Sequence, residues 1–369
     1  MDRKLHFVGS IPLEVSRTDS DALLWPVERA RDNGITAVPR DLDPDWIVDY
    51  LRSRADQREA FEVVLSGEYE ADDYDDLRAY RVRRGVELKP DHVAMGRTAR
   101  INEVVEAYRE LQREHSQLAG VRLQISQPAP LDLALFVEAG GLAVAPGLPW
   151  GKALRHPLPL MRALRHLPVY EQAVSQEIEP LTAAHRDLLT WQIETPLCTL
   201  AMVKAATVPG LQAAMVPLLS LHLASMFARM AALGAHATLH LCYGDYAHKA
   251  LLHPKDLSPL VRLLNGLGAR LDKLGLTRPM VHVPCAYGAE AAPLRPDFYQ
   301  PLSGLDEGWT ELVAGVAAAG QQDTTTALEL FERAAGRRAV AVAAACGLGR
   351  QSVAEADAVV HAMRAAAGS

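Results

Sequence analysis

The sequence predicts a (β/α)₈ barrel, formed as a single domain by residues 1–369, with an excursion at the barrel rim around residues 68–93. Three observations predict this fold class. Eight short apolar runs recur along the chain, segments of helical periodicity separate them, and 369 residues is a length that α/β barrels reach as one domain. Because parallel strands need crossover connections, and the crossovers here are helical, the alternation favours a parallel sheet covered by helices.

Most of the predicted strands are rich in β-branched residues, and in order they are residues 5–8, 35–38, 121–125, 189–193, 237–241, 280–283, 312–316 and 339–344. The predicted helices show helical periodicity, and in order they are residues 21–32, 101–115, 160–186, 211–233, 257–274, 325–335 and 352–366. The first strand runs into Gly9-Ser10-Ile11-Pro12, which is not the glycine fingerprint of a dinucleotide site. An open doubly wound sheet with a nucleotide cofactor is therefore not indicated.

The least regular region is residues 68–93, where an acidic run stands directly before a basic one. A solvated loop or small excursion at the rim explains this pattern. A lid over a substrate site is the alternative, since long loops at a barrel mouth often cover sites.

Composition excludes several functional classes. A net charge of −7, from 38 basic and 45 acidic residues, gives no long-range attraction for nucleic acid or an anionic membrane surface. Four scattered cysteines and a start without the apolar core of a signal peptide favour a reducing cytoplasm. The uncharged residues 205–227 include prolines and polar side chains, so we expect a buried helix of a soluble fold there rather than a membrane span.

Reactive side chains stand at the ends of three predicted strands. Because strand side chains alternate with period two, His240 and Cys242 share one face and could bind one ion together. Cys346, at the end of the eighth strand, would supply a third ligand and leave the open position of a catalytic zinc site. Buried side chains without a metal are the alternative. Cys285 is the candidate fourth ligand, but its parity is opposite to that of His282, so regular pleating turns only one of them inward.

Other polar residues stand near the predicted barrel mouth. Glu194 could bind a substrate ammonium group or act in proton transfer, or it could form a salt bridge at the rim. Ser126 and Gln127 end a strand that proline stops, and there they could contact a substrate. Asp245 and His248 follow the His240 motif and would line the same mouth or a charged loop. The sequence contains no G-x-S-x-G, P-loop or H-E-x-x-H motif, so it does not indicate a serine hydrolase, a P-loop kinase or a common metalloprotease.

Four motifs in order carry a family resemblance: V-G-S-I-P at residues 8–12, W-Q-I-E-T-P at 191–196, H-L-C-Y-G-D at 240–245 and A-C-G-L-G-R at 345–350. They resemble I-G-S-F-P, I-Q-I-D-E-P, H-M-C-Y and D-C-G-L in the catalytic barrel of cobalamin-independent methionine synthases. That family belongs to the wider superfamily that includes uroporphyrinogen decarboxylase. The resemblance extends over nearly the whole chain and implies a (β/α)₈ barrel.

The resemblance also implies a zinc site in which His240, Cys242 and Cys346 match family ligands. Ser10 matches a position near the amino-acid substrate of the family. Glu194 stands where the family has the aspartate that holds the substrate amino group. The family's zinc-binding glutamate has no counterpart in V-H-V-P-C at residues 281–285, so Cys285 or His282 would have to replace it, or the site has changed.

The leading functional prediction is a zinc-dependent transferase that activates a small-molecule thiol for attack on a methyl or alkyl donor. A folate donor is not expected, because the two-barrel family members bind polyglutamyl folate with help from an additional N-terminal barrel. A methyl-corrinoid protein or a small electrophile such as an epoxide could donate the carbon. The alternatives are a lyase or decarboxylase acting on a small carboxylate or sulfur compound, and a metal-free ligand-binding relic of the barrel.

Overall fold

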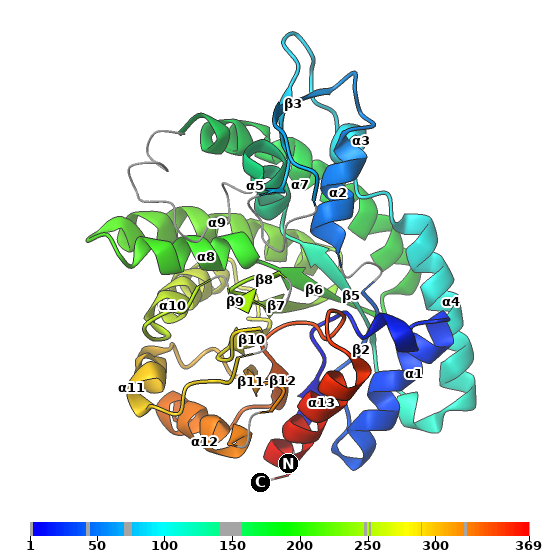
Figure 1. Cartoon of the computed structure of the whole chain (residues 1–369), viewed down its shortest axis with the longest axis vertical. Helices are drawn as coiled ribbons and strands as arrows, with labels where there is room; N and C mark the ends of the chain where they lie inside the picture. Colours follow the sequence, from blue (N-terminus) through cyan, green and yellow to red (C-terminus); the bar gives the residue numbers. More distant parts are fainter. Residues whose placement is uncertain are drawn as a thin grey trace.

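The computed structural model describes residues 3–41, 45–69, 76–140, 157–246, 249–250, 252–288, 290–320 and 323–368. Its central sheet has eight strands in the order β1-β12-β11-β10-β7-β6-β5-β2, each parallel to its neighbours (Figure 1). These strands are β1 (Lys4–His6), β2 (Val38–Pro39), β5 (Leu123–Pro128), β6 (Leu189–Glu194), β7 (His236–His240), β10 (Met280–Pro284), β11 (Leu312–Ala317) and β12 (Ala341–Ala344). Each one overlaps a predicted strand.

The sheet curls until its first and last strands meet. Leu5 in β1 forms a parallel bridge to Ile35, just before β2. There the backbone N–H of Leu5 donates to the carbonyl of Gly34 at 3.0 Å, and that of Thr36 donates to the carbonyl of Leu5 at 3.0 Å. The described strands therefore form a (β/α)₈ barrel, and the predicted fold class is confirmed.

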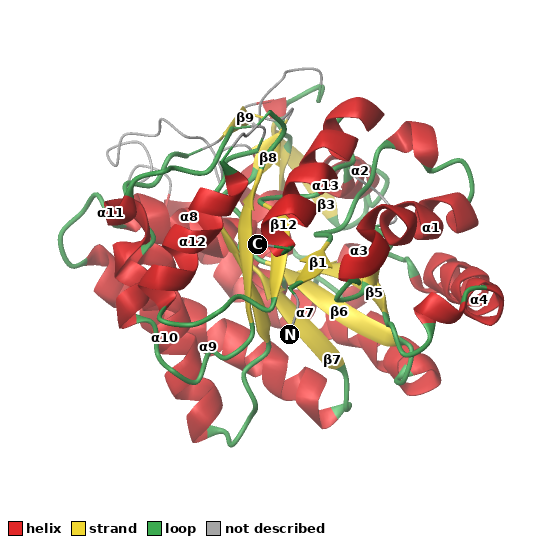
Figure 2. Cartoon of the chain, turned by 90° about the horizontal axis from the view of Figure 1, so that it is seen from below, coloured by secondary structure: helices red, strands yellow, loops and turns green. Residues whose placement is uncertain are grey.

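Helices surround the sheet in both views (Figures 1 and 2). They are α1 (Asp19–Ala30), α2 (Trp46–Arg54), α3 (Pro90–Val93), α4 (Thr98–Glu114), α5 (Pro130–Ala139), α7 (Pro157–His185), α8 (Pro196–Ala205), α9 (Leu211–Ala232), α10 (Ser258–Lys273), α11 (Pro296–Tyr299), α12 (Thr324–Ala335) and α13 (Val353–Ala367). All seven predicted helices are present. Local signals fix some starts: the Thr18 hydroxyl caps α1, and Ser352 and Glu355 form a capping box at α13.

Three longer helices were not predicted: α2, α5 and α8. The last two begin with proline directly after a strand and are buried on nearly all sides. A helix without a polar face has no amphipathic period, so its apolar residues merge with those of the preceding strand.

The rim excursion is a β-hairpin rather than an irregular loop. Strand β3 (Phe61–Leu65) pairs antiparallel with β4 (Ala79–Val82), so the excursion begins before the predicted boundary at residue 68. In Figure 1 the hairpin rises beside α2 and α5. A second short hairpin pairs β8 (Asp245–Tyr246) with β9 (Lys249–Ala250) and lies directly after the H-L-C-Y motif.

One described helix, α9, is long and apolar enough to cross a membrane by length and composition. In this fold it packs against α8 and α10, and it buries Leu219, Leu223 and Met226 in the core. Its hydrophobicity is accounted for in part by packing, as the sequence predicted for a buried helix.

A buried carboxyl group links α5 to the start of α8. Asp132 in α5 accepts from the backbone N–H of Leu197 at 2.6 Å and from the thiol of Cys198 at 3.5 Å. It thereby satisfies N–H groups in the first turn of α8, which have no partner within the helix. Its side chain is fully buried, and burial raises the pKa of Asp132 from 3.8 to about 7.

We expect Asp132 to make folding stability depend on pH. The folded-state pKa lies above the unfolded value, so the contribution is complete below pH 4 and is lost as pH rises toward 7, at up to about 1.4 kcal/mol per pH unit. Asp132→Asn keeps the acceptor but cannot ionise, so its stability should lack this slope. Urea unfolding of both proteins between about pH 5 and about pH 8 measures the difference, and parallel curves would contradict the assignment.

Candidate metal centre

The structure brings together His240, Cys242 and Cys346, which are up to 106 residues apart in the sequence. Strand β7 ends at His240, with Cys242 two residues beyond it, and Cys346 stands two residues beyond the end of β12. One ligand atom from each residue lies within 4.8 Å of the others. His240 and Cys242 are buried, whereas Cys346 is half-buried.

The spacing of these atoms fits a zinc ion. Two sulfurs bound to zinc at about 2.3 Å in tetrahedral geometry lie about 3.8 Å apart, and the Sγ atoms of Cys242 and Cys346 are 3.8 Å apart. Imidazole nitrogen and two thiolates form a donor set that zinc accepts, and three protein ligands leave one tetrahedral position open. The residues present therefore fit the metal that the sequence predicted.

Backbone contacts hold two of these residues in place. The carbonyl of His240 accepts from Thr195 twice, from the backbone N–H at 3.2 Å and from the hydroxyl at 2.8 Å. The backbone N–H of Gly244 donates to Sγ of Cys242 at 3.3 Å and so fixes the position of the sulfur. Gly244 has φ of 79°, a left-handed conformation in which glycine carries no steric penalty, and this turn directs its N–H back toward the sulfur.

The ring of His240 lies between two other side chains. Its Nδ1 is 2.9 Å from Nδ1 of His282, and its Nε2 is 3.5 Å from Oε2 of Glu194. Burial lowers the pKa of His240 well below 6.5, with the nearby His282 ring contributing in the same direction. The ring is therefore neutral at pH 7, which is the form that binds metals.

Glu194 occupies the end of β6 and is the neighbour of His240 in the strand register. Its Oε1 accepts from the amide of Gln192 at 2.7 Å. Burial raises the pKa of Glu194 well above 4.5, and the adjacent Cys242 and Asp41 act in the same direction. A cationic group beside this carboxyl would favour its charged form and reverse that shift.

Ser10 links the loops after β1 and β12. Its carbonyl accepts from the backbone N–H of Leu348 at 2.7 Å, and its hydroxyl accepts from that of Gly349 at 3.2 Å. A Cβ at Gly347 would lie 2.5 Å from the Ser10 hydroxyl and 3.1 Å from its backbone nitrogen, so a larger residue here would displace Ser10. The loop that carries Cys346 is thereby fastened to the barrel.

Ser126 and Gln127 occupy different environments. Ser126 hydrogen-bonds Glu194 and lines a cavity beside it. The Gln127 side chain is fully buried, and its oxygen accepts from Nη2 of Arg97 at 2.6 Å. Arg97 also donates to the carbonyl of Ser126 at 2.9 Å and is paired with Glu177 at 2.6 Å. The structure therefore brings Ser126 to the site, and it uses Gln127 to position Arg97.

The remaining candidates lie elsewhere or outside the described residues. Cys285 packs in the outer core with Val281 and Val283, and its thiol donates to the carbonyl of Val283 at 3.7 Å. Among the described residues, the group of potential ligand atoms that lie within 4.8 Å of one another includes His240, Cys242 and Cys346 but not Cys285. Asp245 begins β8, but its side chain lies outside the described part of the chain, as does the whole of His248.

Two adjoining cavities open at the site. A smaller one of about 60 Å³ is lined by Ser10, Glu194 and both cysteines of the cluster. A larger one of about 280 Å³ is lined by Ser126 and several residues of α2 and the loop before α4. Asp41, Trp46 and Glu194 line both. Asp41 and Trp46 are not among the residues predicted from the sequence, although Asp41 follows the second strand, at the barrel end where catalytic side chains collect.

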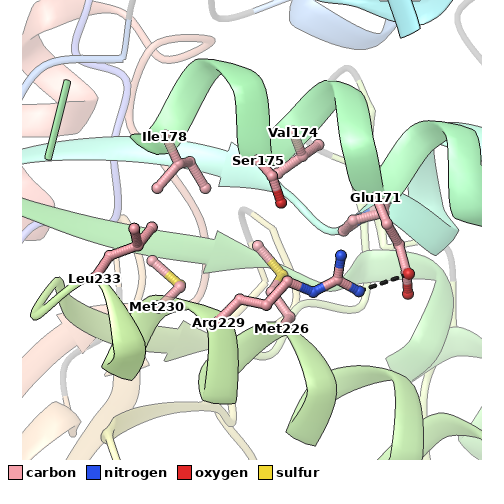
Figure 3. Close-up of a pocket in the computed structure, with 9 residues that line it drawn as sticks. Glu171, Val174, Ser175, Ile178, Met226, Arg229, Met230 and Leu233 are labelled. Atoms are coloured by element: carbon pink, nitrogen blue, oxygen red, sulfur yellow. Dashed lines mark hydrogen bonds and ion pairs between the residues drawn. The ribbon is translucent and has the colours of Figure 1, made fainter. Parts of the chain in front are cut away.

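A further pocket lies away from these residues, between α7 and α9 (Figure 3). It measures about 20 Å³ and is mainly apolar, with Val174, Ile178 and Met226 among its lining residues. Its charged groups, Arg229 and Glu171, pair with each other at 2.6 Å. It contains none of the predicted site residues.

Comparisons with known proteins find one kind of similarity only. No protein-family model matches the sequence, and no curated protein matches it. Among solved structures, a B12-independent methionine synthase from Shewanella sp. W3-18-1, in complex with selenomethionine, is similar with a TM-score of 0.49 and 10% sequence identity. The match covers 100% of this chain and 97% of that one. Similarity at this level assigns no family and no function to the chain.

Proposed function

We propose that this chain is a zinc-dependent enzyme that transfers a methyl or other alkyl group to the sulfur of a small thiol. The observation that carries the proposal is the convergence of His240, Cys242 and Cys346 at the barrel end where β7 and β12 terminate. We assign the activity to one domain of residues 1–369 and, because its ligands must stay reduced, to the cytoplasm.

The donor set favours sulfur chemistry. Zinc held by one imidazole and two thiolates supplies a Lewis acid that lowers the pKa of a thiol entering its open position. Two thiolate ligands donate electron density and so preserve the nucleophilicity of a substrate sulfur. Gly244 and Thr195 serve this chemistry by fixing Cys242 and His240 before substrate arrives.

The two cavities support a small substrate. The thiol enters the smaller cavity, which both cysteines line, and the rest of the molecule extends into the larger one. Glu194 and Asp41 at the junction provide carboxyl groups for an ammonium group, and Trp46 provides an aromatic wall. A small aminothiol fits this combination.

The transfer itself is a displacement at carbon. The thiol loses its proton to solvent, its sulfur forms a bond to the alkyl carbon, and the bond from that carbon to the leaving group breaks with both electrons departing. The donor is a methyl-corrinoid protein or a small activated electrophile. Ser10 and Glu194, which line the same cavity as the two cysteines, hold the thiol for attack.

The test is thioether formation. Zinc-loaded protein is incubated with a panel of small thiols and with methylcobalamin or a small epoxide as donor, and products are identified by mass spectrometry. We expect a thioether with the loaded wild-type protein, and none above background with metal-stripped protein or Cys346→Ser.

Two other results would replace the proposal. Turnover of one carboxylate or sulfur compound without any acceptor would indicate a lyase or decarboxylase. Protein that purifies without zinc and binds its ligand equally well after Cys242→Ser would be a metal-free binding protein.

A further inference from the structure

Three histidines stack inside the barrel beside the metal cluster. The ring centroids of His6 and His282 are 5.9 Å apart, and those of His282 and His240 are 4.7 Å apart, with interplanar angles of 29° and 28°. All three side chains are buried. His240 is the metal-ligand candidate, and the function proposed above gives the other two no role.

The hydrogen bonds of His282 fix the position of its proton. Its Nε2 lies 2.9 Å from the carbonyl oxygen of Ala344, an atom that can only accept. Nε2 of His282 must therefore carry the proton, and in a neutral ring this leaves Nδ1 as an acceptor.

The same reasoning assigns the position of the proton on His240. Its Nδ1 lies 2.9 Å from Nδ1 of His282 and must donate the proton that this contact requires. The Nε2 atom of His240 is then unprotonated. This atom is the one that approaches Glu194, on the side where the cysteines line the cavity.

A glycine makes this arrangement possible. Strand β11 lies between β10 and β12 in the sheet, so the His282 side chain crosses β11 to reach Ala344. It crosses at Gly315, where a Cβ would lie only 2.6 Å from Nε2 of His282. Ala344 ends β12 and precedes Cys346 by two residues, so the end of β12 and the loop after it supply both the carbonyl anchor and one of the cysteines.

We propose that His282 is a positioning residue that holds His240 in its Nδ1–H tautomer and thereby directs the Nε2 lone pair to the metal site. The proposal rests on the proposed function for the identity of the ion, but the tautomers are a property of the metal-free protein. Both nitrogens of His282 are engaged, so His282 is not a metal ligand. The fourth position stays open for the substrate thiol.

The first test needs neither metal nor a variant. Long-range ¹H–¹⁵N correlation spectra of metal-free protein with labelled histidine distinguish protonated from unprotonated ring nitrogens, and the 13 histidines are assigned by single substitutions. We expect His240 as the Nδ1–H tautomer and His282 as the Nε2–H tautomer near pH 7. The opposite tautomer at His240 would overturn the proposal, whether or not the protein binds zinc.

The second test measures metal affinity by competition with a chelator, with Co²⁺ as a spectroscopic probe and Zn²⁺ as competitor. His282→Leu removes the acceptor and should weaken binding by about 10–100-fold. His282→Gln provides an amide oxygen for His240 and an amide N–H for Ala344, so it should restore most of the affinity. Equal affinities for wild type and a folded His282→Leu would overturn the positioning role.

The two tests also separate this inference from the proposed function. Metal binding without thioether formation would remove the transferase and leave the role of His282 intact. If circular dichroism shows that His282→Leu is unfolded, the tautomers of the wild-type protein still decide the proposal.

Discussion

Replacing Cys242 or Cys346 with serine is expected to reduce bound zinc from near one ion per chain to near none. Each sulfur is one of three ligands, and a serine hydroxyl stays protonated at neutral pH and does not replace a thiolate. Metal analysis by plasma mass spectrometry, on protein purified without a histidine tag, gives the stoichiometry. Serine is similar in size to cysteine, so the fold should persist.

Two further variants make this result specific. Cys198→Ser is the matched control, since Cys198 is buried against Asp132 and should retain full zinc. Cys285→Ser tests the predicted fourth ligand. Loss of zinc in this variant would show that Cys285 binds the metal, whereas full zinc content agrees with its place in the outer core. Wild-type protein that stays zinc-free after reduction and added zinc would end the thiol-activation mechanism.

Arg97→Ala is expected to destabilise the fold by about 3 kcal/mol, because it leaves the mostly buried carboxylate of Glu177 without its partner. The same change removes the donors to the Ser126 carbonyl and to the Gln127 amide. The end of β5, which borders the larger cavity, should therefore loosen. Urea unfolding followed by circular dichroism measures the loss.

Comparison with an exposed pair tests the physical reason. Arg81 pairs with Glu62 on the hairpin, where both side chains are substantially exposed, so Arg81→Ala should cost less than about 1 kcal/mol. Arg97→Ala combined with Glu177→Gln removes the unpaired charge and should recover part of the loss. Equal effects of Arg97→Ala and Arg81→Ala would show that burial does not govern the Arg97 pair.

The strands and long helices could be predicted because barrel strands are continuous apolar runs and the outer helices have one apolar face. The helices α5 and α8 could not, because burial on all sides removes the periodic signal. The β3–β4 hairpin was not predicted either, in this case because its residues are exposed. Val63, Val64 and Leu65 are exposed, so they do not show the alternation of a half-buried strand.

Among the site residues, the H-x-C pair was predictable because both side chains stand at one strand end, and Cys346 because the eighth strand closes the barrel. The environments of Cys285 and Gln127 were not predictable in full. Side chains alternate between the two faces along a strand, but this alternation stops at the strand end. The sequence therefore leaves open whether His282 or Cys285 faces the interior. The structure places His282 in the interior and Cys285 in the outer core.

The sequence by itself determined the barrel, its strands and the chemical types gathered at their carboxyl ends, because these depend on local pattern and strand order. Only the tertiary structure decided which atoms meet. The 3.8 Å between two sulfurs 104 residues apart, the carbonyl of Ala344 beneath His282 and the space left by Gly315 depend on strand register and barrel closure. Contacts across non-adjacent strands have no local signature, so no reading of one strand at a time reveals them.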